Sequence, residues 1–264
     1  MGIPLLQVDA FTDRPFRGNP AAVCLLEAER PEEWMQAVAA EMNLAETAFV
    51  RRLDEGWSLR WFTPTVEVDL CGHATLATAH ALWETGRLGP GETARFLTRS
   101  GWLSATRQDG VIQLDFPATP PDEAPAFAPR IVDAIGVQPL WVGRSPFDLM
   151  AVLATAQAVR ALRPDLARVA ELPVRGLIVT ARGDDGTHDF ISRFFGPQSG
   201  VPEDPVTGSA HCALAPYWAA QLGRTTMQAF QASARGGSLR VELAGDRVRL
   251  GGHAVTVFRA ELDA

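Results

Sequence analysis

Hydrophobic and polar residues alternate along several short segments of the chain, as they do in strands with one buried face. Two clear examples are GVIQLDF at 110–116 and SLRVELAGDRVRLGG at 238–252. The turns between such segments are too short for helical crossovers, so we predict antiparallel strands. Two alanine-rich runs, 71–83 and 207–223, each begin near a glycine and consist mostly of small residues, which predicts helices closely wrapped by sheet. The pattern favours an α+β fold over a doubly wound parallel sheet.

A proline-rich segment near the middle divides the chain. Residues 115–130 hold five prolines, which remove backbone donors and favour an extended conformation. We therefore predict an N-terminal domain at 1–117, a linker at 118–130 and a C-terminal domain at 131–264. The last residues of the chain are allowed to pack back on the first domain.

The two halves match at a constant offset of 133 residues. LAETAFV at 44–50 faces LIVTARG at 177–183, and RWFTP at 60–64 faces RFFGP at 193–197, with no gap needed. One offset that serves several segments indicates an internal duplication, although chance similarity in an alanine-rich chain is the alternative. Two copies in one chain predict a binding cleft between them.

Within this match, helix ends and one acidic residue stand out. Pro31 and Pro164 each predict a helix start, and Asn43 and Gly176 the matching helix ends.

Glu46 faces Val179, so a carboxylate occupies a strand position that its twin fills with an apolar residue. A buried carboxylate is costly unless it is partnered, and burial raises its pKa toward a working range. Glu46 is thus a candidate general base, and an exposed glutamate at a strand end is the alternative.

Both predicted central helices begin at a glycine, Gly72 or Gly208. The free N–H groups and the helix dipole there favour an anion, so a substrate carboxylate is expected at these helix starts. A buried helix that merely packs well is the alternative. His73 follows the first glycine, while Asp204 and Ser209 flank the second. These are suitable groups for proton transfer at a carbon next to a carbonyl.

Composition excludes several classes of function. The net charge is −7 and the basic residues are scattered, which argues against a nucleic-acid surface. All 24 basic residues are arginine, so chemistry that needs a lysine amine, such as a Schiff base, is excluded. Three cysteines favour a reducing compartment over a disulfide framework. No signal peptide and no run of 18 apolar residues is visible, and we expect a cytoplasmic protein without membrane segments.

A metal centre or a catalytic triad is not supported by the spacing of the candidate residues. Cys71, His73 and His80 lie close in the sequence, but no CxxC or HxxxH pair with a matching partner accompanies them. Ser209 lacks the glycine spacing of a nucleophile elbow. We predict no metal site.

Four motifs make the chain resemble a known family. They are VDAFTDRPFRGNPAAV at 8–23, MNLAETAFV at 42–50, FTPTVEVDLCGHATLATAHAL at 62–82 and GVPEDPVTGSAHCAL at 200–214. Together they resemble the PhzF family of phenazine biosynthesis-like isomerases, within the diaminopimelate epimerase-like superfamily. The resemblance implies two similar domains, each a curved, mainly antiparallel sheet around a central helix. It also implies an active site between the domains and a homodimer.

The same resemblance assigns residues and chemistry. It implies catalytic roles for four residues and substrate binding by four others: Glu46, His73, Asp204 and Ser209 for catalysis, and Asn19, Gly72, Thr207 and Gly208 for binding. The implied reaction is proton transfer within a small carboxylate-bearing substrate and needs no cofactor. In the founding activity of the family it is an allylic isomerisation of a dihydro-hydroxyanthranilate. The sequence names neither the substrate nor the pathway of this chain.

Related epimerases and proline racemases use two thiols, one at the start of each central helix. Cys71 resembles the first of them, and the internal match leaves Pro205 or Thr207 for the second position, neither of which is a thiol. A two-cysteine racemase is therefore excluded. Two alternatives to the isomerase remain, namely a binding protein of the same fold without turnover and an epimerase that uses Glu46 and Cys71.

Overall fold

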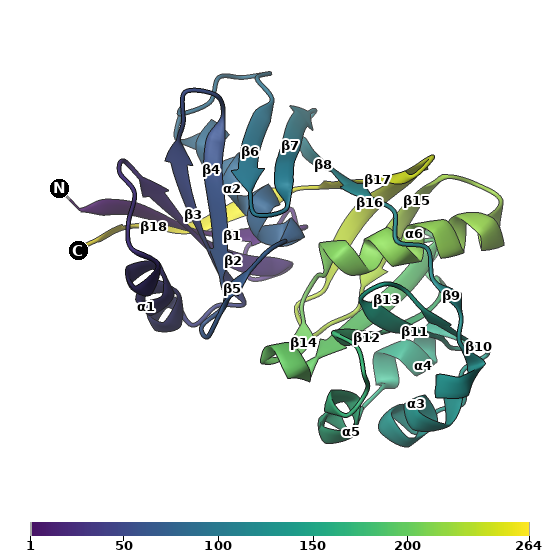
Figure 1. Ribbon diagram of the computed structural model, residues 1–264. Coiled ribbons are helices and arrows are strands. Elements are labelled where there is room, and N and C mark those ends of the chain that lie inside the picture. Colours follow the sequence, from purple (N-terminus) through teal and green to yellow (C-terminus); the bar gives the residue numbers. More distant parts are fainter. Residues whose placement is uncertain (1, 264) are drawn as a thin grey trace. The chain divides into compact units, whose positions relative to one another are not determined.

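The computed structural model describes residues 2–263, which form two compact units, one at 2–115 and 251–263 and the other at 116–250 (Figure 1). The predicted linker at 118–130 is thus part of unit 2. It is not a free connection, because it carries a short strand, a 3-10 turn and the start of a helix. Prolines suit these short edge and helix-start positions, where no backbone donor is needed.

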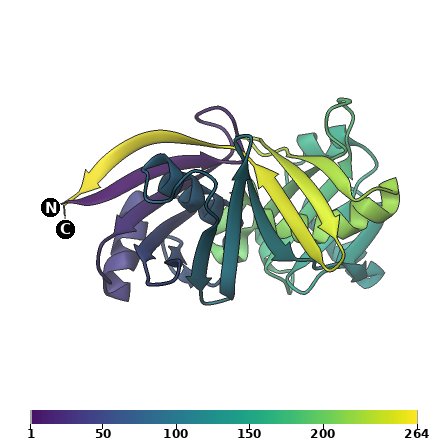
Figure 2. The ribbon, with the colours of Figure 1, turned by 90° about the horizontal axis from the view of Figure 1, so that it is seen from above.

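Unit 1 is one mixed sheet with two helices. Its strands run in the hydrogen-bonded order β18–β1–β2–β3–β4–β6–β7–β8, with β2·β3 and β4·β6 parallel and the other pairs antiparallel. Figure 2 shows β18 along β1, so the C-terminal strand completes the sheet of unit 1. The elements are β1 (Ile3–Ala10), β2 (Asn19–Leu26), α1 (Glu32–Met42), β3 (Glu46–Arg52), β4 (Trp57–Phe62), β5 (Glu67–Val68), α2 (Gly72–Glu84), β6 (Ala94–Thr98), β7 (Gly101–Gln108), β8 (Val111–Pro117) and β18 (Ala254–Leu262).

Unit 2 repeats this strand order. Its sheet runs β9–β10–β11–β12–β13–β15–β16, again with the pairs β11·β12 and β13·β15 parallel. The elements are β9 (Asp122–Glu123), η1 (Pro125–Phe127), α3 (Ala128–Ile135), β10 (Trp141–Arg144), β11 (Asp148–Val152), α4 (Ala156–Ala161), α5 (Leu166–Ala170), β12 (Gly176–Arg182), β13 (Phe190–Gly196), η2 (Pro197–Ser199), β14 (Val201–Asp204), α6 (Gly208–Leu222), β15 (Thr226–Gln231), β16 (Gly237–Ala244) and β17 (Arg247–Gly252). The shared order supports an internal duplication.

The register of the strands corrects the predicted match. Phe49 lies opposite Arg60 in unit 1, and Val179 lies opposite Arg193 in unit 2. If the two arginines correspond, Val179 corresponds to Phe49, and Glu46 corresponds to Gly176. The prediction that Glu46 faces Val179 without a gap is therefore wrong by three residues. Gly176 is also not a helix end, because it is the first residue of β12.

The direction of the side chains confirms this correction. Phe49 belongs to the core under α1, and Val179 belongs to the core under α3, α4 and α5. Glu46, three residues before Phe49, points to the opposite face of the sheet, where it contacts α2. Successive residues of a strand alternate between faces, so an odd shift in register moves every side chain to the wrong face.

The central helices are buried, as predicted. All residues of α2 except His80 and Glu84 are buried, and α2 packs against β1, β2 and β3. A helix that is apolar on every side is typical of a core position. The predicted left-handed end of α1 is also present, at Asn43 with φ 50°. Within residues 2–263, no helix is both long and apolar enough to cross a membrane.

Candidate active site

Four of the predicted polar residues meet in unit 1, where the beginnings of two strands lie beside the beginning of α2. Asn19 starts β2 and Glu46 starts β3, and these strands are parallel neighbours with Ala21 beside Glu46. Cys71 is the N-cap residue of α2, and His73 is in its first turn. Side chains of alternate residues share a face, so Asn19 and Glu46 both point toward the helix.

The position of Asn19 depends on the glycine before it. Gly18 has a φ of +64°, and a Cβ at this residue would lie 2.1 Å from the carbonyl oxygen of Ala10. Only glycine fits this turn, which brings the chain into β2. The Asn19 side chain is fully buried, and its Nδ2 lies 3.0 Å from Nδ1 of His73. Because the amide nitrogen can only donate, Nδ1 accepts and the ring proton of His73 is on Nε2.

His73 and Glu46 form the centre of this cluster. Nε2 of His73 lies 3.2 Å from Oε2 of Glu46, and the two side chains are only 4% and 16% exposed. Burial lowers the pKa of His73 to about 3, because the protein interior disfavours the charged imidazolium. At neutral pH the imidazole is therefore neutral, and its Nε2 lies beside Oε2 of Glu46 without the alignment of a hydrogen bond.

The cluster contains three residues of types that bind metals. Ligand atoms of Glu46, Cys71 and His73 all lie within 4.8 Å of one another. However, the Cys71 sulfur lies 3.5 Å from Nδ1 of His73, whereas Glu46 approaches Nε2. A metal ion binds one nitrogen of an imidazole, so this arrangement does not place the thiolate and the carboxylate around the same nitrogen. The geometry favours acid–base chemistry over metal binding.

The first turns of the two central helices lack the usual side-chain cap. Neither Cys71 at α2 nor Thr207 at α6 makes a capping hydrogen bond from its side chain. By contrast, Thr155 and Asp165 cap α4 and α5. Since threonine is normally a good cap, the arrangement at Thr207 leaves first-turn N–H groups for another acceptor. Such N–H groups and the helix dipole favour an anion.

A second polar cluster lies at the start of α6 in unit 2. The Thr207 hydroxyl donates to Oδ2 of Asp204 over 2.6 Å. Gln231, which is fully buried, accepts from the Thr207 backbone N–H over 2.8 Å and donates from Nε2 to the Asp204 carbonyl over 2.7 Å. Gly208 follows as the first helical residue, and Ser209 is half-buried beside it.

Gln231 was not predicted from the sequence. It ends β15, in which Met227 and Ala229 are the other buried residues. A polar residue at an apolar position of an alternating strand is costly unless it is bonded, and that is the signal that could have identified it.

The structure identifies the counterpart of Cys71. Val68 lies opposite Trp61 in unit 1, and Asp204 lies opposite Phe194 in unit 2. With β4 and β13 aligned, this places the helix starts at an offset of 136 residues. Cys71 thus corresponds to Thr207, and the other candidate, Pro205, is eliminated. The second thiol position of a two-cysteine racemase is occupied by a hydroxyl that is bonded to a carboxylate.

Unit 2 has no room for an equivalent of Glu46. Gly176 occupies the corresponding position, and a Cβ there would lie 2.4 Å from Cζ of Phe194. The Phe194 ring, on the neighbouring strand, fills the space that a side chain at 176 would need. Of the two corresponding positions, therefore, one carries a carboxylate and the other is closed by an aromatic ring.

Comparison with known proteins shows which family the chain resembles along most of its length. The family model described as phenazine biosynthesis-like protein matches residues 8–260. An uncharacterized isomerase of Halalkalibacterium halodurans is 49% identical over 262 residues, which is 99% of each chain. The crystal structure of a PhzF-family protein from Enterococcus faecalis superposes with a TM-score of 0.95 at 42% identity, and the match covers 100% of both chains.

A more distant structure shows the wider fold group. A hydroxyproline epimerase from Agrobacterium vitis has a TM-score of 0.62 at 12% identity, over 98% of this chain and 92% of its own. At that identity the similarity concerns the fold alone. It agrees with the predicted epimerase-like α+β architecture.

Proposed function

The chain belongs to the phenazine biosynthesis-like (PhzC-PhzF) family, and on that basis we propose that it is an isomerase that moves a proton within a small carboxylate-bearing substrate. Glu46 is the general acid/base in this proposal, and no cofactor is required. A relative that is named an isomerase and a fold shared with epimerases support the general class.

The contact between Glu46 and His73 carries the proposal. A base must hold its oxygen free of competing cations and close to a group that fixes its orientation. Here the neutral ring of His73, held by Asn19, places its Nε2 3.2 Å from Oε2 of Glu46. A protonated imidazole would instead neutralise the carboxylate and weaken it as a base.

The proposed reaction balances without an oxidant or reductant. Glu46 removes a proton from a carbon next to a conjugated system, so a C–H bond breaks and an O–H bond forms. The electron pair of the C–H bond moves into the conjugated system of the substrate. Glu46 then returns the proton to another carbon of the same molecule, and the double bond has moved.

The substrate carboxylate is assigned to first-turn N–H groups of α2, at Gly72, and the start of α6, at Gly208, is proposed as a second anion-binding helix start. Both N-cap residues leave these groups without a side-chain cap, which supports the assignment. Asp204 and Ser209 are proposed as proton carriers, with Thr207 holding Asp204 through its hydroxyl.

Proton exchange in heavy water tests the proposal. The protein is incubated with a panel of small unsaturated carboxylic acids that includes a dihydro-hydroxyanthranilate, and C–H signals are followed by NMR. Because the base exchanges its proton with solvent, we expect deuterium in at least one acid together with a shifted double bond. Binding of a panel member without deuterium incorporation would indicate a binding protein of this fold instead.

The second candidate function is an epimerase in which Cys71 works on the opposite face of the substrate from Glu46. Two contacts favour this epimerase. The Cys71 sulfur lies beside Nδ1 of His73, and Oε2 of Glu46 lies beside Nε2 of the same ring. Against it stands Thr207, which replaces a second thiol.

We expect Cys71→Ala to keep its turnover, with a loss well below the ~100-fold that removal of an acid or base would cause. Isomerisation rates of the variant and the parent protein on the same acid provide the measurement. A loss of ~100-fold or more in a folded Cys71→Ala protein would establish a role for the thiol.

A further inference from the structure

An arginine–glutamate pair is repeated in the two units at corresponding positions. In unit 1, Arg60 of β4 donates to both oxygens of Glu67 in β5, over 2.7 and 2.5 Å. In unit 2, Arg193 of β13 donates to both oxygens of Glu203 in β14, over 2.7 and 2.8 Å. Each glutamate lies five residues before the first residue of a central helix: Glu67 before Gly72 of α2, and Glu203 before Gly208 of α6.

A second contact is repeated in the same two places. The Ser100 hydroxyl donates to the carbonyl oxygen of Asp69 over 2.7 Å, and the Ser233 hydroxyl donates to that of Pro205 over 2.8 Å. Asp69 and Pro205 correspond at the same offset as the helix starts. Each segment that leads into a central helix is thus held at two points, once by an ion pair and once by a serine. We call these two contacts together the clamp.

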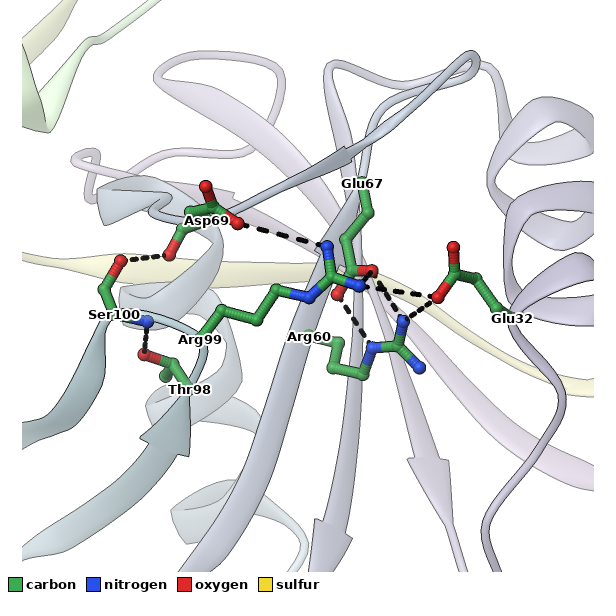
Figure 3. A network of polar contacts seen from close by, with 7 residues as sticks. All are labelled: Glu32, Arg60, Glu67, Asp69, Thr98, Arg99 and Ser100. Carbon is green, nitrogen blue, oxygen red and sulfur yellow. Dashed lines mark hydrogen bonds and ion pairs between the residues drawn. The ribbon is translucent and has the colours of Figure 1, made fainter.

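Further charges surround the clamp of unit 1, as Figure 3 shows. Arg99 contacts the same carboxylate of Glu67 over 2.6 Å, and Glu32 of α1 contacts Arg60 over 2.6 Å. The Glu67 side chain is only 4% exposed, and the guanidinium groups of Arg60 and Arg99 replace the water contacts that its carboxylate loses on burial. Ser100 is fixed in turn by its backbone N–H, which donates to the Thr98 hydroxyl over 3.1 Å.

Apolar packing contributes little to holding this segment. Val66 and Leu70 are 52% and 36% exposed, Val68 is only half-buried, and β5 has only two residues. The segment ends at Cys71 and His73, whose positions relative to Glu46 determine the geometry of the site. Directional polar bonds are therefore the main contacts that set where α2 begins.

Fold stability alone does not explain why both units have an ion pair here. A buried ion pair is often no more stabilising than an apolar pair of the same size, since its desolvation offsets its attraction. A bidentate arginine–carboxylate pair does fix the relative position of two segments more narrowly than apolar contact does.

We propose that Arg60, Glu67 and Ser100 are positioning residues for the reaction. They hold the start of α2 so that Nε2 of His73 lies beside Oε2 of Glu46. Arg193, Glu203 and Ser233 do the same for Thr207 and Asp204 at the start of α6. The expected effect of these residues on turnover rests on the proposed function, whereas their effect on the position of His73 does not.

The test is Glu67→Gln, which keeps the shape of the side chain and removes its charge. Two-bond ¹H–¹⁵N spectra report the tautomer of each histidine, and the chain has only 5. In the parent protein, we expect a single His73 tautomer with its proton on Nε2. In Glu67→Gln we expect mixed tautomers or a broadened His73 signal, with turnover on an identified substrate lowered roughly 10- to 100-fold.

Two matched variants serve as controls. Glu203→Gln makes the same change in unit 2, and we expect it to leave the His73 spectrum unchanged. Glu27→Gln removes an exposed glutamate that pairs with Arg87 over 2.7 Å in unit 1, and we expect the parent spectrum and the parent turnover. The histidine spectrum needs no substrate, so it tests the placement of His73 even if the proposed isomerase activity is not found.

A parent-like His73 spectrum in folded Glu67→Gln would overturn the proposal. If that variant does not fold, Ser100→Ala removes the other half of the clamp and leaves the ion pair. An altered His73 spectrum in Ser100→Ala then supports the positioning role. A parent-like spectrum in Ser100→Ala contradicts it.

Discussion

Glu46→Gln is expected to lower turnover by at least ~100-fold, the low end for loss of a general base. Glutamine has the shape of glutamate but cannot accept a proton from carbon at neutral pH. The Glu46 side chain is 16% exposed and lies 3.2 Å from Nε2 of His73, so the substitution needs little rearrangement. The measurement is turnover on an acid that the parent protein isomerises, together with deuterium incorporation from heavy water.

The control is Glu41→Gln, which makes the same chemical change on the exposed outer helix α1 of the same unit. It is expected to match the parent protein in both turnover and thermal unfolding. Near-normal turnover in Glu46→Gln would rule out Glu46 as the base. An unfolded variant would be recognised by its melting curve, so loss of the base and loss of the fold can be told apart.

Stability is expected to fall steeply as the pH falls below about 6.5, because two histidines are buried in the neutral state. Burial lowers the pKa of His73 to about 3 and that of His211 to about 4. In the unfolded chain both return to about 6.5, so the unfolded state binds more protons between these values. The contribution of the neutral rings to the free energy of unfolding is fully present above pH 6.5. It is lost as the pH falls from 6.5 toward the lowered pKa values of the two histidines.

The expected slope approaches about 1.4 kcal/mol per pH unit for each histidine, or about 2.7 kcal/mol per pH unit for the two together, between pH 6 and 4.5. Urea unfolding at a series of pH values measures it. His211 donates from Nδ1 to the Thr207 carbonyl over 2.8 Å, and among residues 2–263 its Nε2 has no acceptor for a second ring proton. In His211→Gln we therefore expect the slope to fall by about half. A flat profile from pH 6.5 to 4.5 would show that neither ring is held neutral by burial.

Several features of the site could be predicted from the sequence because they depend on local chemistry. The alanine-rich run with glycine at its start predicts α2 and α6, since small residues and free first-turn N–H groups are local properties. Asn43 predicts a helix end for the same reason, because its tolerance of a left-handed backbone is intrinsic. The motif resemblance placed His73 and Glu46 in one site, and the structure brings them to 3.2 Å.

The pairing of the two halves could not be predicted correctly from the sequence. Glu46 was matched to Val179, but the sheet aligns it with Gly176. The turn between β12 and β13, residues 183–189, is three residues longer than the turn between β3 and β4, residues 53–56, and a match without gaps conceals such a difference. The register is set by hydrogen bonds to the neighbouring strand, which join residues far apart in the chain.

By itself, then, the sequence determined which residue types were present for the chemistry and which helix starts could receive an anion. Only the tertiary structure decided three further features: the tautomer of His73, set by Asn19 of β2, the fixing of Thr207 by Gln231, and the repeated clamps. Each of these is a contact between segments distant in sequence. Local propensities do not encode such contacts, because they arise when burial forces polar groups to find partners across the fold.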